Sequence, residues 1–194
     1  MPTRQLKSTH RLSMNEVTTY RWSFEEDIWH YVEAGYEGIG IWRQKLADYG
    51  EERGVDLVAE SKLHVTNLHW AGGFTGNEGK SLPEAIDDAA DAIRLAGALQ
   101  AGCLIVYPGG RNNHTFRHAT RLLAEAIEQL LPLAEASDVT LAFEPMHPAC
   151  ASQWTFLTDL SETVAFLQNF ASPQLKIVLD VYHFGQDDGL IENL

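Results

Sequence analysis

Six short apolar runs alternate with amphipathic segments along this 194-residue chain, and this alternation limits the possible folds more than any other feature. Apolar runs of about four to eight residues are typical of buried parallel strands, whereas apolar positions that recur every three to four residues are typical of surface helices. Strands separated by helices indicate an α/β fold with a parallel sheet. The predicted strands are 12–17, 38–42, 63–69, 103–107, 140–144 and 176–180.

Helix starts are marked by capping signals. Ser23 and Ser81 are each followed three residues later by a glutamate, which is the spacing of a capping box. Gly38 and Gly40 do not precede a phosphate-binding helix in the G-x-G-x-x-G pattern, so we interpret them as sites of close packing. The predicted helices are 23–34, a segment within 49–61, 81–98, 115–136 and 159–170, with a further helix start at 188–194.

Composition and charge exclude several classes of protein. The 14 basic and 27 acidic residues give a formal net charge of −13, and no lysine/arginine cluster is present, so we expect no nucleic-acid partner. No run approaches the ~20 apolar residues of a membrane span, and the first residues lack the apolar core of a secretory signal. We therefore expect one cytoplasmic domain over residues 1–194, with no membrane partner, in which Cys103 and Cys150 remain thiols.

Two architectures fit the alternation, a doubly wound open sheet and a (β/α)8 barrel. Residues that suit a functional site follow strands two to six alike: Trp42, His69, Tyr107, Glu144 and Asp180. A barrel predicts this, because all its strands end around one site, whereas an open sheet concentrates chemistry at one crevice. A barrel needs about 250 residues and eight strands. We therefore predict a (β/α)8 barrel fold of which this chain holds strands one to six.

Two of the strand ends carry the main functional signal. Glu144 and Asp180 each follow an apolar run directly, and His183 lies three residues after Asp180. The carboxyl ends of parallel strands lie at one edge, so the two carboxylates could share a metal ion. The alternative is that each acid only caps the loop that follows its strand.

The sequence Phe143-Glu144-Pro145-Met146-His147-Pro148 and the sequence Leu179-Asp180-Val181-Tyr182-His183 resemble the sugar phosphate isomerase/epimerase family of xylose isomerase-like TIM barrels. The resemblance implies a divalent cation (Mn, Mg, Co or Zn) held by Glu144 and Asp180. The family completes this site with a histidine after strand seven and a glutamate at strand eight, which have no counterpart in the chain. Met146-His147-Pro148-Ala149 departs from the pattern of the ketose 3-epimerases.

The resemblance also implies roles for individual residues in a proton transfer through an enediolate. Glu144 would be one half of the acid/base pair, and His183 would contact a substrate oxygen. His69, Trp42, Tyr107 and His147 are the candidates for substrate binding. The alternatives are a structural histidine at His69 or His183, a solvent-facing His147, and ordinary core packing for Trp42 and Tyr107.

Three classes of function remain open. The first is a metal-dependent isomerase, epimerase or lyase that acts on a small sugar or polyol. The second is a phosphodiesterase of the endonuclease IV type, which would need more histidine ligands and a positive groove. The third is a non-catalytic barrel fragment or binding module, whose open edges at strands one and six would allow association with copies of itself.

Overall fold

The computed structural model describes residues 12–76 and 79–185 of the chain. Its strands form one sheet in the chain order β1-β2-β3-β4-β5-β6, and the pairings of β1 with β2 and of β3 through β6 are parallel. This confirms the predicted parallel α/β fold. The strands are β1 Ser13–Asn15, β2 Gly38–Trp42, β3 His64–Gly72, β4 Leu104–Tyr107, β5 Leu141–Phe143 and β6 Leu175–Ile177. The helices are α1 Phe24–Glu33, α2 Arg43–Tyr49, α3 Glu51–Ser61, α4 Leu82–Ala98, α5 Phe116–Ala136, α6 Pro148–Ala151, α7 Leu160–Gln168 and α8 Val181–Phe184.

The structure corrects several predicted boundaries. Strand β6 ends at Ile177, so the prediction that the strand runs to Asp180 is wrong. The chain turns there because the Asp180 side chain accepts a hydrogen bond from the backbone N–H of Tyr182 and caps α8. Strand β1 is also shorter than predicted, and helices α2 and α6 were not expected. The helix start predicted at 188–194 lies outside the described residues.

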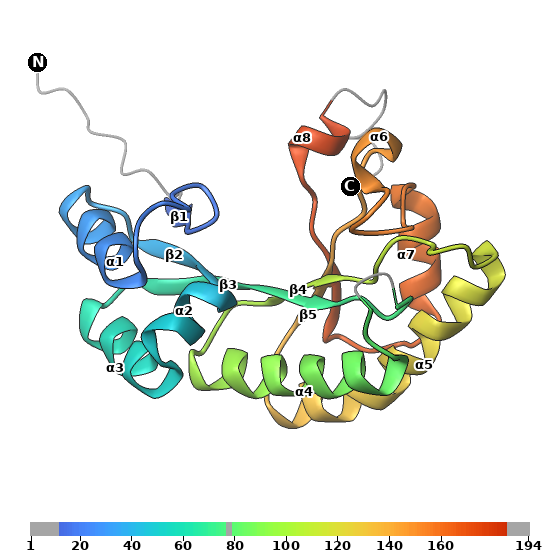
Figure 1. Ribbon diagram of the computed structural model, residues 1–194, viewed down its shortest axis with the longest axis horizontal. Helices are drawn as coiled ribbons and strands as arrows, with labels where there is room; N and C mark the ends of the chain where they lie inside the picture. Colours follow the sequence, from blue (N-terminus) through green and yellow to red (C-terminus); the bar gives the residue numbers. More distant parts are fainter. Residues whose placement is uncertain (1–11, 77–78, 186–194) are drawn as a thin grey trace, which may run out of the picture. The chain divides into compact units, whose positions relative to one another are not determined.

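The chain divides within β3 into two compact units, Met1–Asn67 and Leu68–Leu194. In the first unit, α1, α2 and α3 pack against one another (Figure 1). A Cβ atom on Gly40 would lie 2.7 Å from side-chain atoms of both Asn15 and Asn67. Close packing, as the sequence predicts, therefore explains this glycine.

A buried polar cluster lies in the first unit and consists of the buried side chains of Glu16, Asp27 and Lys45 together with the half-buried Thr19. Lys45 and Asp27 form an ion pair whose side chains are 8% and 0% exposed. Thr19 Oγ1 donates a hydrogen bond of 2.6 Å to Asp27, and Lys45 Nζ donates one of 2.9 Å to the Thr19 carbonyl. Glu16 is 0% exposed, and its Oε2 accepts a 2.7 Å hydrogen bond from the backbone N–H of Trp42.

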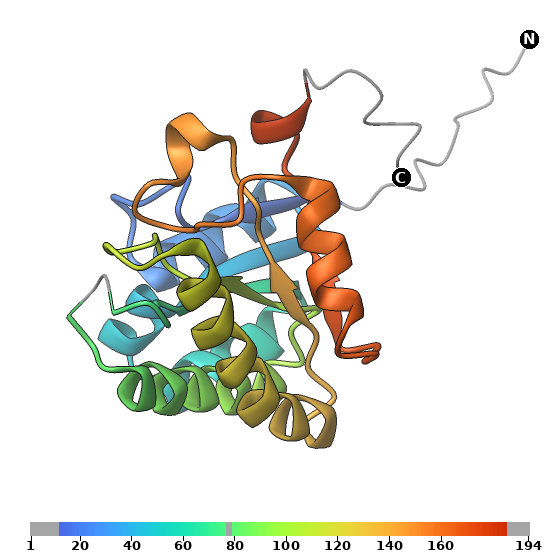
Figure 2. The same ribbon diagram turned by 90° about the vertical axis from the view of Figure 1, so that its right-hand side faces the viewer.

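The second unit holds the end of β3 and the elements from α4 to α8. Helices α4 and α5 pack against each other (Figure 1), and α7 packs against β6 (Figure 2). The Ser81 capping box is present at the start of α4, as predicted. Neither Cys103 nor Cys150 forms a disulfide. Within the described ranges, the helices are all too short or too polar to cross a membrane.

Strands β3 and β4 approach each other unusually closely where β3 ends. Gly72 has a φ of +139°, and a Cβ atom there would lie 1.7 Å from the Tyr107 carbonyl oxygen. The register of the pairing also shifts between His69 and Ala71. Adjacent residues of a regular strand point to opposite faces, but the shift allows the rings of His69 and Trp70 both to contact the Tyr107 ring, at 5.4 and 6.0 Å between centroids.

Candidate metal centre

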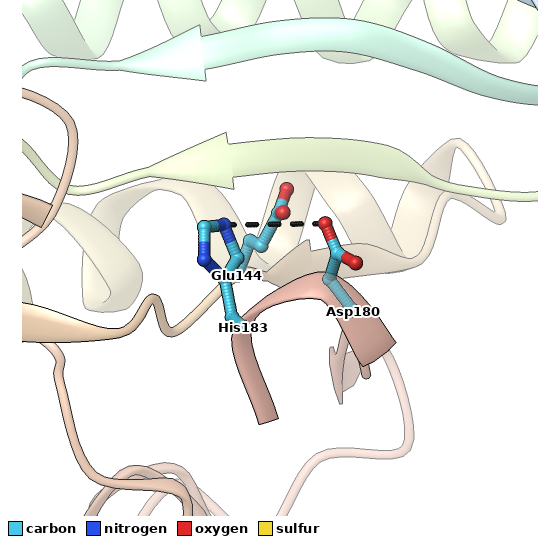
Figure 3. A group of neighbouring side chains, drawn as sticks. All are labelled: Glu144, Asp180 and His183. Atoms are coloured by element: carbon cyan, nitrogen blue, oxygen red, sulfur yellow. Dashed lines mark ion pairs between the residues drawn. The ribbon is translucent and has the colours of Figure 1, made fainter. Parts of the chain in front are cut away.

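Three side chains of the second unit converge on one point. Glu144, Asp180 and His183 each offer a ligand atom, and these atoms all lie within 4.8 Å of one another (Figure 3). Glu144 directly follows β5, Asp180 is the N-cap of α8, and His183 lies on the first turn of that helix. Asp180 Oδ2 lies 3.9 Å from His183 Nε2. The structure thus brings together the three residues that the sequence selects at the ends of strands five and six.

The local charge environment of Glu144 suits a group that binds a cation or moves a proton. Its side chain is only 7% exposed. Burial raises the pKa of Glu144, the hydrogen bond from Tyr107 lowers it, and the Asp180 charge raises it again. A buried carboxylate beside a second carboxylate is stabilised by a cation between them.

The three residues fit a divalent cation. Metal bonds to nitrogen and oxygen ligands are about 2.0–2.6 Å long, so ligand atoms around one ion lie within about 5 Å of one another, as these do. In addition, His183 Nδ1 is buried and has no hydrogen-bond partner within the described residues. Two carboxylates and one imidazole suit Mn, Co or Zn, and two carboxylates alone suit Mg. The set therefore agrees with the metal ligands that the resemblance implies, and His183 is a candidate third ligand.

Tyr107 and His69 lie next to this group. The Tyr107 hydroxyl donates a hydrogen bond of 2.7 Å to Glu144 Oε2 and lies 3.3 Å from His69 Nε2. Burial lowers the pKa of His69 to about 4, so its ring is neutral at pH 7. Tyr107 thus contacts Glu144 directly, and His69 is connected to Glu144 through the Tyr107 hydroxyl. Their assignment to substrate binding stays a prediction.

The family of the chain follows from a match to a family model, described as xylose isomerase-like TIM barrel, over residues 30–193. The chain belongs to this family. The match confirms the resemblance inferred from the Glu144 and Asp180 motifs, as well as the predicted xylose isomerase-like barrel fold, of which the described residues form six strands. No curated protein matches the sequence.

Solved structures of xylose isomerase-like proteins superpose on the chain. Protein SMc04130 from Sinorhizobium meliloti 1021 is 29% identical, with a TM-score of 0.85 over 93% of this chain and 66% of its own. The E. coli 3-keto-D-glucoside 4-epimerase YcjR is 12% identical, with a TM-score of 0.74 over 88% and 68%. The IolI protein with a bound zinc atom is 20% identical, with a TM-score of 0.77 over 94% and 67%. The chain thus spans about two-thirds of the length of these three proteins.

Two other residues selected from the sequence do not join the group. His147 is exposed, and its Nδ1 accepts a hydrogen bond of 3.2 Å from the backbone N–H of Ala149, which caps α6. Trp42 belongs to the first unit, where it is half-buried and precedes α2. Their roles in substrate binding stay predictions.

Trp154 is a residue that sequence reasoning missed. Its ring is 40% exposed, and it packs edge-on against Trp70 at 5.3 Å and beside Tyr107 at 5.8 Å between centroids. It lies in the loop that follows Glu144, where no periodicity predicts a position for a side chain. A tryptophan in the loop after a metal-ligand motif was the only available signal.

Proposed function

We propose that this protein is a metal-dependent isomerase or epimerase that moves a proton next to a carbonyl group of a sugar or sugar phosphate, through an enediolate. The observation that carries this proposal is the convergence of Glu144, Asp180 and His183 within 4.8 Å. The three together suit a cation, and one of them, Glu144, is a carboxylate that can accept a proton.

Each residue has a distinct part in this reaction. A divalent cation, when bound, supplies positive charge that stabilises the negative charge developing on the substrate oxygens. Glu144 accepts the proton next to the carbonyl, and burial raises its pKa, which makes the ionised carboxylate a stronger base. Asp180 would help to hold the cation. His183, whose Nε2 lies 3.9 Å from Asp180 Oδ2, contacts a substrate oxygen or serves as a third ligand.

Two structural neighbours support this choice of chemistry. YcjR is a sugar epimerase, and IolI binds a zinc atom, although at 12% and 20% identity each demonstrates a shared fold only. The formal charge of −13 disfavours a phosphodiester backbone as the substrate. In this family, as the resemblance implies, ligands from later strands complete the metal site to which Glu144 and Asp180 would belong.

The test is an activity assay on a panel of keto sugars, sugar phosphates and polyols with Mn²⁺, Mg²⁺, Co²⁺ or Zn²⁺. We expect activity on a member of the panel, removal of that activity by EDTA, and loss of at least about 100-fold in Glu144→Gln. Glu162→Gln, an exposed residue of α7, is the matched control. Full activity in Glu144→Gln would rule out its role in proton transfer. Cleavage of abasic DNA without isomerisation would instead favour the endonuclease class.

A further inference from the structure

The Tyr107 hydroxyl lies between two polar side chains from neighbouring strands. It is 2.7 Å from Glu144 Oε2, beyond β5, and 3.3 Å from His69 Nε2, on β3. Tyr107 is 7% exposed. Within the described part of the chain, its hydroxyl is also the only hydrogen-bond donor recorded for the Glu144 carboxylate. These three side chains therefore form one chain of hydrogen bonds that leads to the candidate metal centre.

The number of protons determines the direction of this chain. A tyrosine hydroxyl carries one proton, and the Glu144 carboxylate oxygen at 2.7 Å is a closer acceptor than the His69 nitrogen at 3.3 Å. The shorter contact, to Glu144, therefore takes the proton. The contact between Tyr107 and His69 can then be a hydrogen bond only if His69 donates from Nε2. Because the His69 ring is neutral at pH 7, this requires the tautomer with hydrogen on Nε2 and none on Nδ1.

Aromatic rings surround the tyrosine and restrict other positions of its hydroxyl. Tyr107 contacts the rings of His69, Trp70 and Trp154 at centroid separations of 5.4, 6.0 and 5.8 Å. Its ring also belongs to a cluster of buried residues that includes Ile105, Ala142 and Met146. The ring thus has no room to swing away from Glu144.

We propose that Tyr107 is a positioning residue that fixes the Glu144 carboxylate, and that His69 orients the Tyr107 hydroxyl by donating from Nε2. The direction of the hydrogen bonds stands on the two distances, and the tautomer of His69 follows from them together with its neutral ring. Only its consequence for metal binding rests on the proposed function. A carboxylate fixed in this way loses less freedom when it binds a cation, and outer partners of this kind typically change metal affinity by about 10–100-fold.

The first arm of the test measures the tautomer of His69 in the metal-free chain. Long-range ¹H–¹⁵N correlation spectra distinguish a protonated Nε2 from a protonated Nδ1, and the His69→Gln variant assigns the signal. We expect the Nε2–H tautomer at pH 7. The Nδ1–H tautomer would overturn the proposal, because His69 would then accept from Tyr107 and the hydroxyl could not donate to Glu144. This arm needs neither activity nor a metal.

The second arm uses substitutions and calorimetric titration with Mn²⁺. Tyr107→Phe removes the hydroxyl, and we expect Mn²⁺ affinity to fall about tenfold or more. A glutamine amide nitrogen lies near the position of Nε2, and that of asparagine near Nδ1. His69→Gln should therefore keep most of the affinity, and His69→Asn should lose it as Tyr107→Phe does. Equal affinities of the two His69 variants would contradict the orienting role.

Control measurements separate this proposal from the proposed function. Tyr36→Phe, which removes a tyrosine hydroxyl from the first unit, should leave Mn²⁺ affinity unchanged, and circular dichroism checks the folding of each variant. A wild-type chain that has the Nε2–H tautomer but does not bind Mn²⁺ would count against the proposed function and support the hydrogen-bond chain. A chain that binds Mn²⁺ but has the Nδ1–H tautomer would support metal binding at the site and contradict the hydrogen-bond chain.

Discussion

Oδ2 of Asp180 lies 3.9 Å from Nε2 of His183, within a single turn of α8. The other oxygen of the same carboxylate, Oδ1, accepts a hydrogen bond of 2.7 Å from the backbone N–H of Tyr182. The sequence leaves open whether Asp180 is a helix cap or a metal ligand, and this geometry shows that the two roles are compatible. The cap holds the carboxylate at the start of the helix, with its second oxygen toward His183.

The Asp180→Asn substitution separates these two roles. Asparagine is also a good N-cap residue, so α8 should remain capped, whereas the negative charge of the ligand is lost. We expect affinity for Mn²⁺ to fall by roughly 100-fold with little change in stability. Isothermal titration with Mn²⁺ and urea unfolding of the same sample measure the two effects.

The matched control for this change is Asp159→Asn. Asp159 caps α7 by accepting a hydrogen bond of 2.8 Å from the backbone N–H of Glu162, and it lies outside the candidate metal centre. The Asp159→Asn variant should bind Mn²⁺ with the same affinity as the unmodified chain. An equal loss of affinity in both variants would indicate that the carboxylates act only through overall charge.

The close approach of β3 to β4 gives a second prediction. Gly72→Ala would place a Cβ atom 1.7 Å from the Tyr107 carbonyl oxygen, so the strands must separate. We expect a loss of about 3 kcal/mol or more in the free energy of unfolding, measured by urea denaturation. Gly35→Ala is the control, because Gly35 also has a positive φ, +79°, but has nothing within 4 Å of an added Cβ atom. It should cost only about 1–2 kcal/mol, and a similar loss at both positions would rule out the steric explanation.

Local signals in the sequence predicted where α4 begins. The sequence Ser81-Leu82-Pro83-Glu84 predicts where α4 begins, and the helix runs from Leu82 to Ala98 as expected. The capping bonds lie within four residues, so a short stretch of sequence contains all the information. The identity of Glu144, Asp180 and His183 as neighbours also followed from the sequence, through the rule that parallel strands end at one edge.

Long-range contacts could not be predicted in the same way. The bond between Tyr107 and Glu144 depends on the registers of β3, β4 and β5, and the approach of His69 depends on the register shift beside it. Likewise, Glu16 seemed to belong to the first strand, and nothing near it in the sequence indicates that Asp27 and Lys45 would join it in the core. Such contacts arise from packing of distant segments, which single-sequence patterns do not specify.

The capping box of α4 gives a third prediction. Ser81 accepts a hydrogen bond from the backbone N–H of Glu84, and the Glu84 carboxylate accepts one of 2.7 Å from the backbone N–H of Ser81. Ser81→Ala removes one of these partners and should lower the free energy of unfolding by about 1 kcal/mol. Ser161→Ala, at an exposed position inside α7, is the control and should change it by less than about 0.5 kcal/mol. Urea denaturation followed by circular dichroism compares the two.

The buried Glu16 gives the fourth prediction, which concerns pH. Burial is the main reason that the pKa of Glu16 rises from 4.5 to about 8; the hydrogen bond from Trp42 opposes this, and the Asp27 charge adds to it. Glu16 Oε1 is buried and has no hydrogen-bond partner among the described residues. A proton on Glu16 would be shared with the nearby Asp27 carboxylate, so the cluster with Lys45 is neutral when Glu16 is protonated.

The sign of the effect on stability follows from proton binding. Between pH 4.5 and about 8 the folded chain holds a proton on Glu16 that the unfolded chain has lost, so the free energy of unfolding decreases as pH rises through this window. Glu16→Gln keeps a neutral hydrogen-bonding group in the same volume. It should stabilise the chain at pH 8 by on the order of 2 kcal/mol relative to the unmodified chain, and by much less at pH 5.

Urea denaturation across this pH range, with the exposed Glu25→Gln as the control, tests the prediction. Glu25→Gln should follow the unmodified chain at each pH, because that side chain is in water in both states. Parallel stability curves for Glu16→Gln and the unmodified chain would show that Glu16 does not hold its proton in the folded state. Lys45 alone would then balance the charge of the buried cluster, with two ionised carboxylates and one ammonium group buried together, an arrangement that a low dielectric strongly disfavours.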